Sequence, residues 1–402
     1  MNPLKLGLGG VGGFGRQHVA MAETLVAEGL VEIVAFAEPS DAPEAVGRLG
    51  AAGARRYADF HDMLAGESDL DLVCIASPIP CHVPMARAAF ERGVHVYLEK
   101  PPAVRIQDLR ELVALQERAG VFCCVGFQDI ARPMVAALKR ALCGGEVGRI
   151  RSIRAEARSQ RTAAYYARAP WAGRVRLGED YVLDGPMNNA CAHVLNLAAY
   201  LAAPDLHEFA RPLWVQGEVY RAEAAGKDAE DTNCLRGAMD SGVEVCVHLT
   251  QCASRHYPRS WTITGDGGTA RLHDTDGVEL PGRRIPPSQP ETPETTLFRR
   301  LVEVILESDE PLLMPLAEAE GHLLLSNGAY ESSGRIHTIP EAYTAQVDAG
   351  GGPAVVVNGL DEAMAECAAA GRLLSEAEVP WAVATEPFDL TAYEGFPARW
   401  SG

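Results

Sequence analysis

The chain has 402 residues, 47% of them hydrophobic, and a formal net charge of −18 at pH 7. This length predicts two or three domains with sizeable cores, and the acidic charge argues against a general binder of nucleic acid or of anionic membranes. The sequence has neither a run of 18 apolar residues nor a basic leader followed by a long apolar segment, and its histidines are scattered. We therefore expect a cytoplasmic protein that has no membrane partner and holds no metal.

The first element is an apolar run, Leu4 to Leu8, which is short enough to be a buried strand. A glycine-rich turn that fits G-x-G-x-x-G follows it, and an amphipathic helix comes next. Strand, glycine turn and helix in that order are the context that a dinucleotide fingerprint requires. The first glycine permits the tight turn, the second lets the backbone approach a pyrophosphate, and the third lets helix and strand pack closely. The N–H groups at the helix start can then receive the phosphate charge, and the expected cofactor residues are Gly10, Gly12, Gly13, Phe14 and Gly15.

A second buried strand is expected from Val31 to Phe36, and Glu38 stands just after it. Glu38 follows Gly15 by 23 residues, close to the ~20 expected for the acid that binds the ribose hydroxyls. A carboxylate there accepts hydrogen bonds from a 2′-hydroxyl and repels a 2′-phosphate. The prediction is therefore NAD, with NADP as the alternative; the simpler interpretation is a solvated glutamate at a strand end.

Helical and strand patterns then alternate up to about residue 130. The expected helices are 43–49, 60–65, 82–92 and 106–119, and the expected further strands are 55–57, 72–76, 95–98 and 121–127. This alternation predicts an α/β domain over residues 1–130, a Rossmann-type doubly wound parallel sheet with helices on both faces. Ligands of such sheets bind beyond the carboxyl ends of the strands.

Polar and turn residues stand at those expected strand ends. Lys100 follows an apolar strand directly and precedes two prolines, and Pro101 restricts it to extended geometry. A lysine in a partly desolvated cleft can have a lowered pKa and exchange protons near neutrality. Taken alone, however, a lysine at a strand end is more often solvated than catalytic.

Three of these motifs together resemble the Gfo/Idh/MocA family of NAD(P)-dependent oxidoreductases. They are the loop from Gly10 to His18, Ser77-Pro78 followed by His82, and Glu99-Lys100-Pro101. The similarity extends over most of residues 4–335 and includes Val147-Gly148-Arg149-Ile150. It implies that Lys100 lies beside the nicotinamide and takes part in catalysis. It also implies that the cofactor cleft is lined by Ser77, Pro78, His82, Glu99 and Gln128.

The pattern changes after residue 149, where several strands follow one another with few helices between them. Strands are expected at 149–158, 214–221, 233–239, 243–250, 261–264 and 269–273, and helices near 297–307 and 316–331. This succession predicts an α+β domain with an open antiparallel sheet over residues 131–338. The resemblance implies that one sheet face helps to wall the active site and that the other often makes oligomer contacts, so we expect a homo-oligomer. Residues 339–402, with a helix over 360–374, are expected to be a C-terminal extension packed on the core.

Residues 187–203 have helical spacing and no charged side chain. Four polar residues fall on one face of this expected helix: Asn189, His193, Asn196 and Tyr200. An uncharged helix is expected to be buried, and buried polar groups need partners. This polar line is either satisfied inside the protein or directed at a substrate.

The resemblance favours the substrate interpretation but also shows a departure from the family's pattern. In the family this helix carries D-x-G-x-H-x-x-D, whose first Asp and His join the Lys in catalysis. The matching residues here are Asn189, Cys191, His193 and Asn196. Asn189 can hydrogen-bond but cannot accept a proton at physiological pH, so His193 or Lys100 must be the base. Asp184, just upstream, is a candidate to replace the missing acid.

One charge anomaly lies between Arg149 and Arg176, where eight arginines stand against a single acid, Glu156. The simpler interpretation is a solvated sheet edge, or a contact with an acidic surface of another subunit. The alternative is an anionic substrate such as a sugar acid, held by arginines. Trp171 and Arg174 belong to this stretch and are candidate substrate contacts.

The sequence therefore predicts an NAD(P)-dependent oxidoreductase that transfers a hydride between the nicotinamide and a hydroxyl of a sugar, polyol or sugar acid. Lys100, His193 and Asn189 are the expected catalytic residues, and Trp171, Arg174, Asn196 and Asp184 the expected substrate contacts. One alternative is a glycosidase or lyase that uses NAD without net redox change. Another is a non-catalytic sensor of NAD, suggested by the amides at Asn189 and Asn196.

Overall fold

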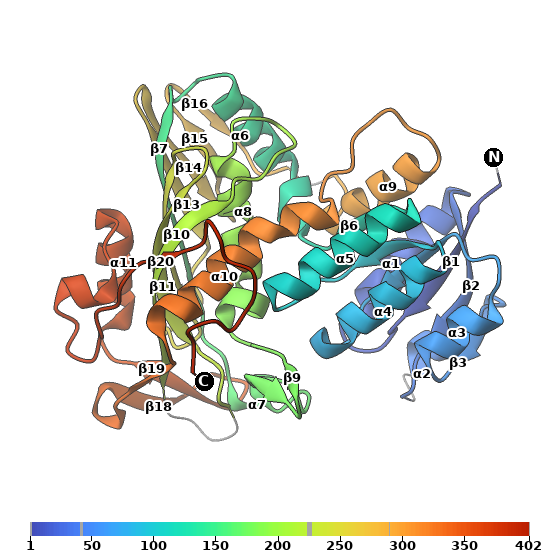
Figure 1. Ribbon diagram of the computed structural model, residues 1–402, viewed down its shortest axis with the longest axis horizontal. Helices are drawn as coiled ribbons and strands as arrows, with labels where there is room; N and C mark the ends of the chain where they lie inside the picture. Colours follow the sequence, from blue (N-terminus) through green and yellow to red (C-terminus); the bar gives the residue numbers. More distant parts are fainter. Residues whose placement is uncertain (1, 41–42, 223–226, 289, 402) are drawn as a thin grey trace. The chain divides into compact units, whose positions relative to one another are not determined.

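The computed structural model describes residues 2–40, 43–222, 227–288 and 290–401. The chain divides into two compact units (Figure 1). The first unit holds the described residues of 1–103, 108–131 and 289–319, and the second holds those of 104–107, 132–288 and 320–402. A late segment of the sequence therefore belongs to the unit that begins the chain.

Within the described residues, the first unit contains a six-stranded sheet in which every neighbouring pair of strands is parallel. In sheet order the strands are β3 (Arg55–Tyr57), β2 (Val31–Ala37), β1 (Leu4–Gly9), β4 (Leu72–Ile75), β5 (His95–Leu98) and β6 (Cys123–Val125). The order reverses between β1 and β4, which is the switch point at which such sheets bind ligands. The predicted Rossmann-type sheet is confirmed.

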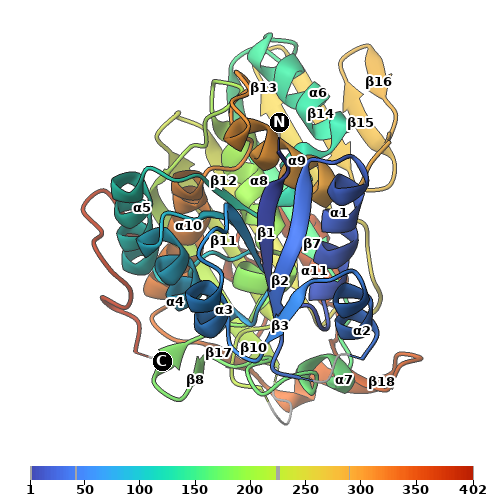
Figure 2. The ribbon, with the colours of Figure 1, turned by 90° about the vertical axis from the view of Figure 1, so that its right-hand side faces the viewer.

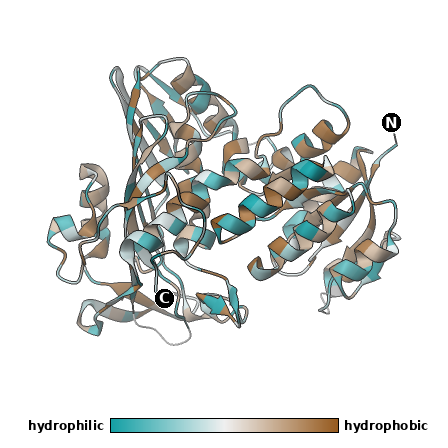
Figure 3. Cartoon of the chain, viewed as in Figure 1, coloured by the Kyte–Doolittle hydropathy of each residue, from teal (hydrophilic) through white to brown (hydrophobic). Residues whose placement is uncertain are grey.

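Helices cover both faces of this sheet. Figure 2 shows α1 and α2 on one side of β1 and β2, and α3, α4 and α5 on the other. Along α4 and α5, brown and teal segments alternate in Figure 3, as expected for helices with one buried face. The helices of this unit are α1 (Gly15–Ala27), α2 (Pro43–Ala51), α3 (Phe60–Gly66), α4 (Ile79–Glu91), most of α5 (Ile106–Ala119) and α9 (Pro293–Ile305), with 3₁₀ turns η1 (Gln128–Ala131) and η3 (Leu316–Ala319).

Within the described residues, the second unit contains a ten-stranded sheet. Most neighbours are antiparallel, but β7 pairs with β12 in parallel and β10 pairs with β17 in parallel. The sheet is therefore mixed rather than wholly antiparallel. Its strands are β7 (Ile150–Arg158), β10 (Pro212–Ala222), β11 (Thr232–Met239), β12 (Glu244–Thr250), β13 (Ser260–Gly265), β14 (Gly268–His273), β15 (Gly277–Leu280), β16 (Arg283–Ile285), β17 (His337–Ile339) and β20 (Phe388–Asp389).

Helices α8 and α10 lie on one face of the mixed sheet, and α11 lies on the other (Figure 1). Two short hairpins, β8–β9 and β18–β19, stand apart from the sheet. The elements are α6 (Pro133–Cys143), α7 (Ala163–Tyr166), α8 (Ala192–Ala202), α10 (Glu320–Ser333), α11 (Leu360–Ala370), β8 (Arg176–Leu177), β9 (Asp180–Tyr181), β18 (Thr344–Asp348), β19 (Pro353–Val357) and the short turns η2 (Pro186–Ala190), η4 (Glu341–Tyr343) and η5 (Leu374–Ala377).

Two predicted helices are wrong in their bounds. The expected helix over 187–203 is a π-type turn, η2, followed after a break at Cys191 by α8, because Cys191 leaves helical geometry at ψ 15°. The expected helix over 360–374 ends at Ala370, because Gly371 adopts a φ of +69° and caps it. The remaining predicted helices and strands are present, with ends shifted by a few residues.

The C-terminal part of the chain covers one face of the mixed sheet. Tyr220 and Cys234 of the sheet are buried in a cluster with Met364 of α11 and with Trp381, whose ring centroid lies 5.0 Å from that of Tyr220. This apolar contact attaches α11 to the sheet. Across the described residues, no helix is both long enough and apolar enough to cross a membrane.

Candidate active site

The glycine turn between β1 and α1 has the geometry that a bound pyrophosphate needs. Gly10 has a φ of +89°, and a Cβ on it would lie 2.8 Å from the carbonyl oxygen of Ala76. A Cβ on Gly15 would lie 2.4 Å from the carbonyl oxygen of Gly10. Both positions therefore require glycine, and the backbone amides of Gly13 and Phe14 face no hydrogen-bond acceptor within the described residues. Amides of this kind at a helix start suit a phosphate group.

Glu38, at the end of β2, turns back onto the glycine turn. Its carboxylate accepts hydrogen bonds from the backbone amides of Val11 (3.0 Å) and Gly12 (2.9 Å), and from the amide and hydroxyl of Ser40. Burial alone would raise the pKa of Glu38, but these hydrogen bonds together lower it. The carboxylate is thus held ionised beside the turn, as expected for an acid that receives ribose hydroxyls.

The turns after β4 and β5 are joined by His82, which is buried on α4. Its Nδ1 lies 2.7 Å from the carbonyl oxygen of Pro101, and its Nε2 lies 2.8 Å from that of Ser77. Burial lowers the pKa of His82, whereas both carbonyls favour the protonated ring. Because backbone groups occupy both nitrogens, His82 positions these two turns and its polar atoms are not directed at a cofactor.

Lys100 is half-buried in the turn after β5, and the Lys100–Pro101 peptide is cis. The neighbouring carboxylate of Glu99 accepts a hydrogen bond from the backbone amide of Lys100 at 3.1 Å and lies 3.0 Å from Nε2 of His18. Both Glu99 and His18 are buried. The sequence did not single out His18 as a site residue, although its place at the end of the glycine loop was visible.

The other predicted cofactor residues also lie at the carboxyl edge of the first sheet. Ser77 and Pro78 follow β4, and Pro78 is exposed. Gln128 lies in η1 after β6, and its amide donates a hydrogen bond to Glu294 of α9 at 3.1 Å. The turns after β1, β2, β4, β5 and β6 therefore bring the predicted cofactor residues to one edge, apart from His82, which lies on α4.

In the second unit, Asp184 and Asn189 form the centre of a polar cluster. The carboxylate of Asp184, only 1% exposed, accepts hydrogen bonds from the side-chain amide of Asn189 (2.5 Å), the backbone amide of Gly173 (2.6 Å) and Arg168 (3.1 Å). The carboxylate of Asp184 thus has a partly exposed arginine and two further donors, and one of those donors is the side-chain amide of Asn189, which it holds in place. With its nitrogen fixed on Asp184, Asn189 is oriented to accept a hydrogen bond through its oxygen.

His193 and Asn196 lie one turn apart on α8, and both are buried. Asn189 is in η2, on the other side of the break at Cys191. The polar line predicted for one continuous helix is therefore divided between two elements. Its three members still belong to one short segment of the chain.

Most arginines of the 149–176 stretch have partners within the second unit. Arg151 pairs with Asp266 at 2.6 Å, and the guanidinium of Arg174 lies 3.7 Å from Asp228. Arg168 pairs with Asp184 and also lies 4.7 Å from the ring of Trp171. Acids from distant parts of the sequence thus balance much of this positive charge, an explanation that the local sequence did not suggest.

Glu230 is a fully buried acid that supports η2. Its carboxylate accepts hydrogen bonds from the hydroxyl of Tyr330 and, at 3.4 Å, from the backbone amide of Met187. A Cβ on Gly185 would lie 2.0 Å from this carboxylate, so a larger residue there would displace the Glu230 side chain. Burial raises the pKa of Glu230 from 4.5 to about 8.

We expect Glu230→Gln to change how stability depends on pH. An acid whose pKa is raised in the folded state stabilises the fold below its unfolded pKa, and this contribution disappears as the pH rises towards 8. At pH 5 the free energy of unfolding of Glu230→Gln should therefore be no higher than that of the wild type. By pH 8 the difference between the two proteins should have moved in favour of the variant by a few kcal/mol. Urea unfolding of both proteins at pH 5, 6.5 and 8 measures the difference, and a constant difference would contradict the raised pKa.

Family models match both units. Residues 4–127 match a model described as an oxidoreductase family with an NAD-binding Rossmann fold, and residues 135–271 match the Gfo/Idh/MocA C-terminal domain. The inositol 2-dehydrogenase of Klebsiella pneumoniae subsp. pneumoniae is 25% identical over 279 residues, which are 69% of this chain and 76% of that protein. This chain is therefore similar to proteins that are named for a reaction on a cyclic polyol.

Solved structures share the fold. The WlbA dehydrogenase from Bordetella pertussis, in complex with NADH and UDP-GlcNAcA, has a TM-score of 0.70 at 23% identity, covering 82% of this chain and 96% of that one. An oxidoreductase from Agrobacterium radiobacter, in complex with NAD⁺, L-tartaric acid and magnesium, has a TM-score of 0.64 at 19% identity, covering 82% and 96%. Because both family models name the same family and together match more than half of the sequence, the chain belongs to the Gfo/Idh/MocA family of oxidoreductases, and its first unit is an NAD-binding Rossmann domain.

Proposed function

We propose that the protein is a dehydrogenase that transfers a hydride between NAD and a hydroxyl-bearing carbon of a small carbohydrate-like molecule, either a sugar, a polyol or a sugar acid. The observation that supports it most directly is the alignment of the glycine turn, Glu38 and the Lys100 turn along one edge of the parallel sheet. The name of the inositol 2-dehydrogenase relative supports a polyol among these substrates.

Oxidation of such a carbon requires removal of a hydride and of the hydroxyl proton. When bound, NAD supplies the hydride acceptor. We assign orientation of the substrate and proton relay to Lys100, and the main acid–base role to His193. Asn189, with its amide nitrogen held by Asp184, accepts a hydrogen bond from a substrate hydroxyl. Trp171, Arg174 and Asn196 are the further substrate contacts that we propose.

We expect Glu38→Ser to shift the cofactor preference from NAD towards NADP. The change removes the carboxylate that repels a 2′-phosphate, and Arg56, whose guanidinium lies 3.2 Å from the carbonyl oxygen of Glu38, is close enough to pair with that phosphate. The ratio of kcat/KM for NAD to that for NADP should fall at least about tenfold. A tenfold change corresponds to about 1.4 kcal/mol, which is what one charge-assisted contact with the 2′-phosphate contributes. Steady-state kinetics with both cofactors measure the ratio. Glu38→Asp serves as the charge-preserving control, and an unchanged ratio in Glu38→Ser would remove Glu38 from the ribose site.

The direct test of the function is turnover with a panel of polyols, sugars and sugar acids, after mass spectrometry of the native protein for bound nucleotide. Net formation of NADH with any of them supports a dehydrogenase. Cleavage of a glycoside at a constant level of bound NAD would instead show the redox-neutral glycosidase or lyase. Stoichiometric NAD binding without turnover would favour a sensor, the function that Asn189 and Asn196, amides at the family's acid positions, support.

We also propose that the protein is a cytoplasmic homo-oligomer that associates through the outer face of the mixed sheet. α11 occupies part of that face, and beside it a groove is lined by Arg154, Thr262, Thr264 and Arg271. Light scattering of the purified protein measures its mass, and a monomer at micromolar concentration would contradict the proposal. The three-part division at residues 130 and 338 likewise stays a proposal.

A further inference from the structure

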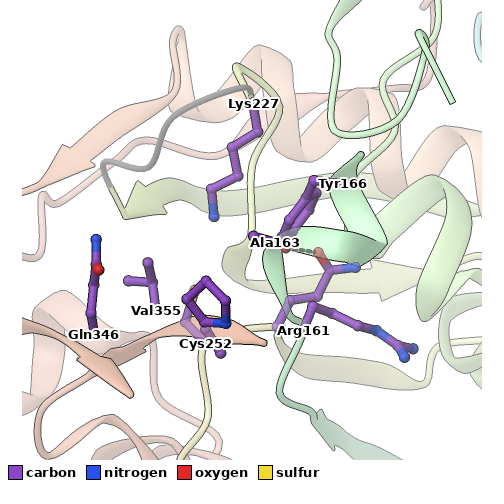
Figure 4. A pocket seen from close by; sticks show the side chains of 10 residues that line it. Arg161, Ala163, Tyr166, Lys227, Cys252, Gln346 and Val355 are labelled. Atoms are coloured by element: carbon purple, nitrogen blue, oxygen red, sulfur yellow. Dashed lines mark hydrogen bonds between the residues drawn. The ribbon is translucent and has the colours of Figure 1, made fainter. Parts of the chain in front are cut away.

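A cavity of about 150 Å³ lies in the second unit (Figure 4). Four segments that are distant in the sequence form it: the chain around α7, Lys227 in the segment before β11, the two residues that follow β12, and the β18–β19 hairpin. Its lining includes the polar side chains of Tyr166, Lys227 and Gln251 and the apolar side chains of Cys252, Ala354 and Val355. A volume of this size is enough for a ligand of a few non-hydrogen atoms, since an apolar cavity of about 150 Å³ can hold benzene.

The ammonium of Lys227 is the charged group at the centre of the cavity. In Figure 4 it points between Val355, Cys252 and Tyr166. The side chain is only 2% exposed and forms an ion pair with Asp231, its one hydrogen-bond partner among the described residues. An ammonium carries three N–H donors, so two remain for a ligand. Asp231 balances the charge of the lysine, and the spare charge-assisted donors still favour an anionic acceptor over a neutral one.

The neighbouring polar groups are also arranged as donors. The hydroxyl of Tyr166 donates to the side-chain oxygen of Gln251 at 2.7 Å, and both residues line the cavity. Because that oxygen is occupied, the amide nitrogen of the buried Gln251 is the part of the side chain that can serve a ligand. A donor amide beside an ammonium matches a carboxylate, which accepts hydrogen bonds through two oxygens.

The rest of the wall is apolar and comes largely from the C-terminal hairpin. Pro353, Ala354 and Val355 of β19 line the cavity together with Ala163 and Cys252. The hairpin is fixed there by a β-bridge between Thr162 and Ala354 and by a 3.0 Å hydrogen bond from the amide of Val357 to the carbonyl of Cys252. It lies beyond residue 271, where the family-model match ends. The cavity is thus built partly from a segment outside that match.

We propose that this cavity binds a small organic monocarboxylate whose carboxyl group pairs with Lys227 and Gln251 and whose short apolar body packs against Ala354 and Val355. The apolar wall favours an organic acid over inorganic phosphate, which has no apolar part to bury. This site is separate from the proposed hydride-transfer residues, none of which lines the cavity.

The test is calorimetric titration of the full-length protein with sodium butyrate, butyramide and inorganic phosphate at pH 7, without substrate. We expect saturable binding of butyrate at one site per chain, with a dissociation constant of about 1 mM or lower. Butyramide, which has the same shape but no charge, and phosphate should each bind at least tenfold more weakly. Equal binding of either probe would overturn the proposal, as would a lack of saturation with butyrate.

Two variants locate the site. Val355→Trp fills the cavity and leaves the ion pair of Lys227 and Asp231 intact, so it should abolish binding while the protein keeps its melting temperature within a few degrees. Lys227→Met should also abolish binding, and Lys5→Met, at an exposed lysine of the first unit, should leave it unchanged. Full butyrate affinity in folded Val355→Trp would show that butyrate binds elsewhere. The titration measures butyrate binding without turnover. Its outcome is therefore independent of whether the protein proves to be a dehydrogenase.

Discussion

Replacing Lys100 with methionine is expected to lower kcat by about 10²–10⁴-fold, the usual contribution of a positioned acid–base group. The lysine stands in the stiff turn after β5, whose backbone is held by the carboxylate of Glu99 and by His82. Methionine keeps an unbranched apolar side chain and removes the ammonium group with its charge and its proton. Steady-state formation of NADH with the best substrate of the panel measures the loss.

Two further variants separate chemistry from binding. Lys100→Arg keeps the positive charge but cannot exchange a proton near neutrality, so its kcat should also fall strongly while the KM for NAD changes little. Lys5→Met, at an exposed lysine, should behave as the wild type. If Lys100→Met retained turnover within about threefold of the wild type, the proposed role of this lysine would be wrong.

Glu331→Ala is expected to destabilise the second unit by about 3–5 kcal/mol. Glu331 lies on α10 and its side chain is fully buried. Its carboxylate binds the C-terminal segment of the chain through several hydrogen bonds. It accepts hydrogen bonds from the hydroxyl of Tyr393 (2.7 Å) and from the consecutive backbone amides of Ala398 (2.6 Å), Arg399 (2.5 Å) and Trp400 (2.7 Å). Removing the acceptor takes it from the Tyr393 hydroxyl and the Trp400 amide in a buried environment, and from the amides of Ala398 and Arg399 in a partly buried one.

Thermal unfolding measures the effect of Glu331→Ala, and a loss of this size should lower the melting temperature by roughly 6–20 °C. Glu331→Gln keeps one acceptor oxygen and should lose less, and Tyr393→Phe removes a single donor and should cost about 1 kcal/mol. A melting temperature for Glu331→Ala within about 2 °C of the wild type would contradict the proposed anchoring of the tail.

The elements that the sequence predicted are those with a strong local pattern. The glycine turn, the strand that precedes it and Glu38 are all visible within the first 38 residues, because strand, turn and helix follow one another directly. The mixed character of the second sheet was not predictable in this way. The parallel pairing of β7 with β12 joins segments that are far apart in the sequence, and no local pattern specifies such a neighbour.

In the candidate site, too, features with a local sequence pattern were predictable and contacts between distant residues were not. The residues at the strand ends could be named from the sequence, because parallel strands bring their carboxyl ends to one edge. The contact between Asp184 and Asn189 depends on the break at Cys191, which the uniform apolar spacing of residues 187–203 concealed. The partners of the arginines, such as Asp266 and Asp228, were equally hidden, since they lie far from the basic stretch in the sequence.

Residues 290–319, which belong to the first unit, constrain when that unit can fold during translation. The ring of Phe298 on α9 packs edge-to-face on Tyr97 of β5 at 5.4 Å, and the amide of Val125 donates to the carbonyl of Met314 at 2.9 Å. While the ribosome is still translating the second unit, β5 and β6 lack these partners. The nucleotide-binding unit can therefore reach its final packing only after residue 319 has left the exit tunnel, and a truncated chain that stops at residue 131 would lack part of its own core.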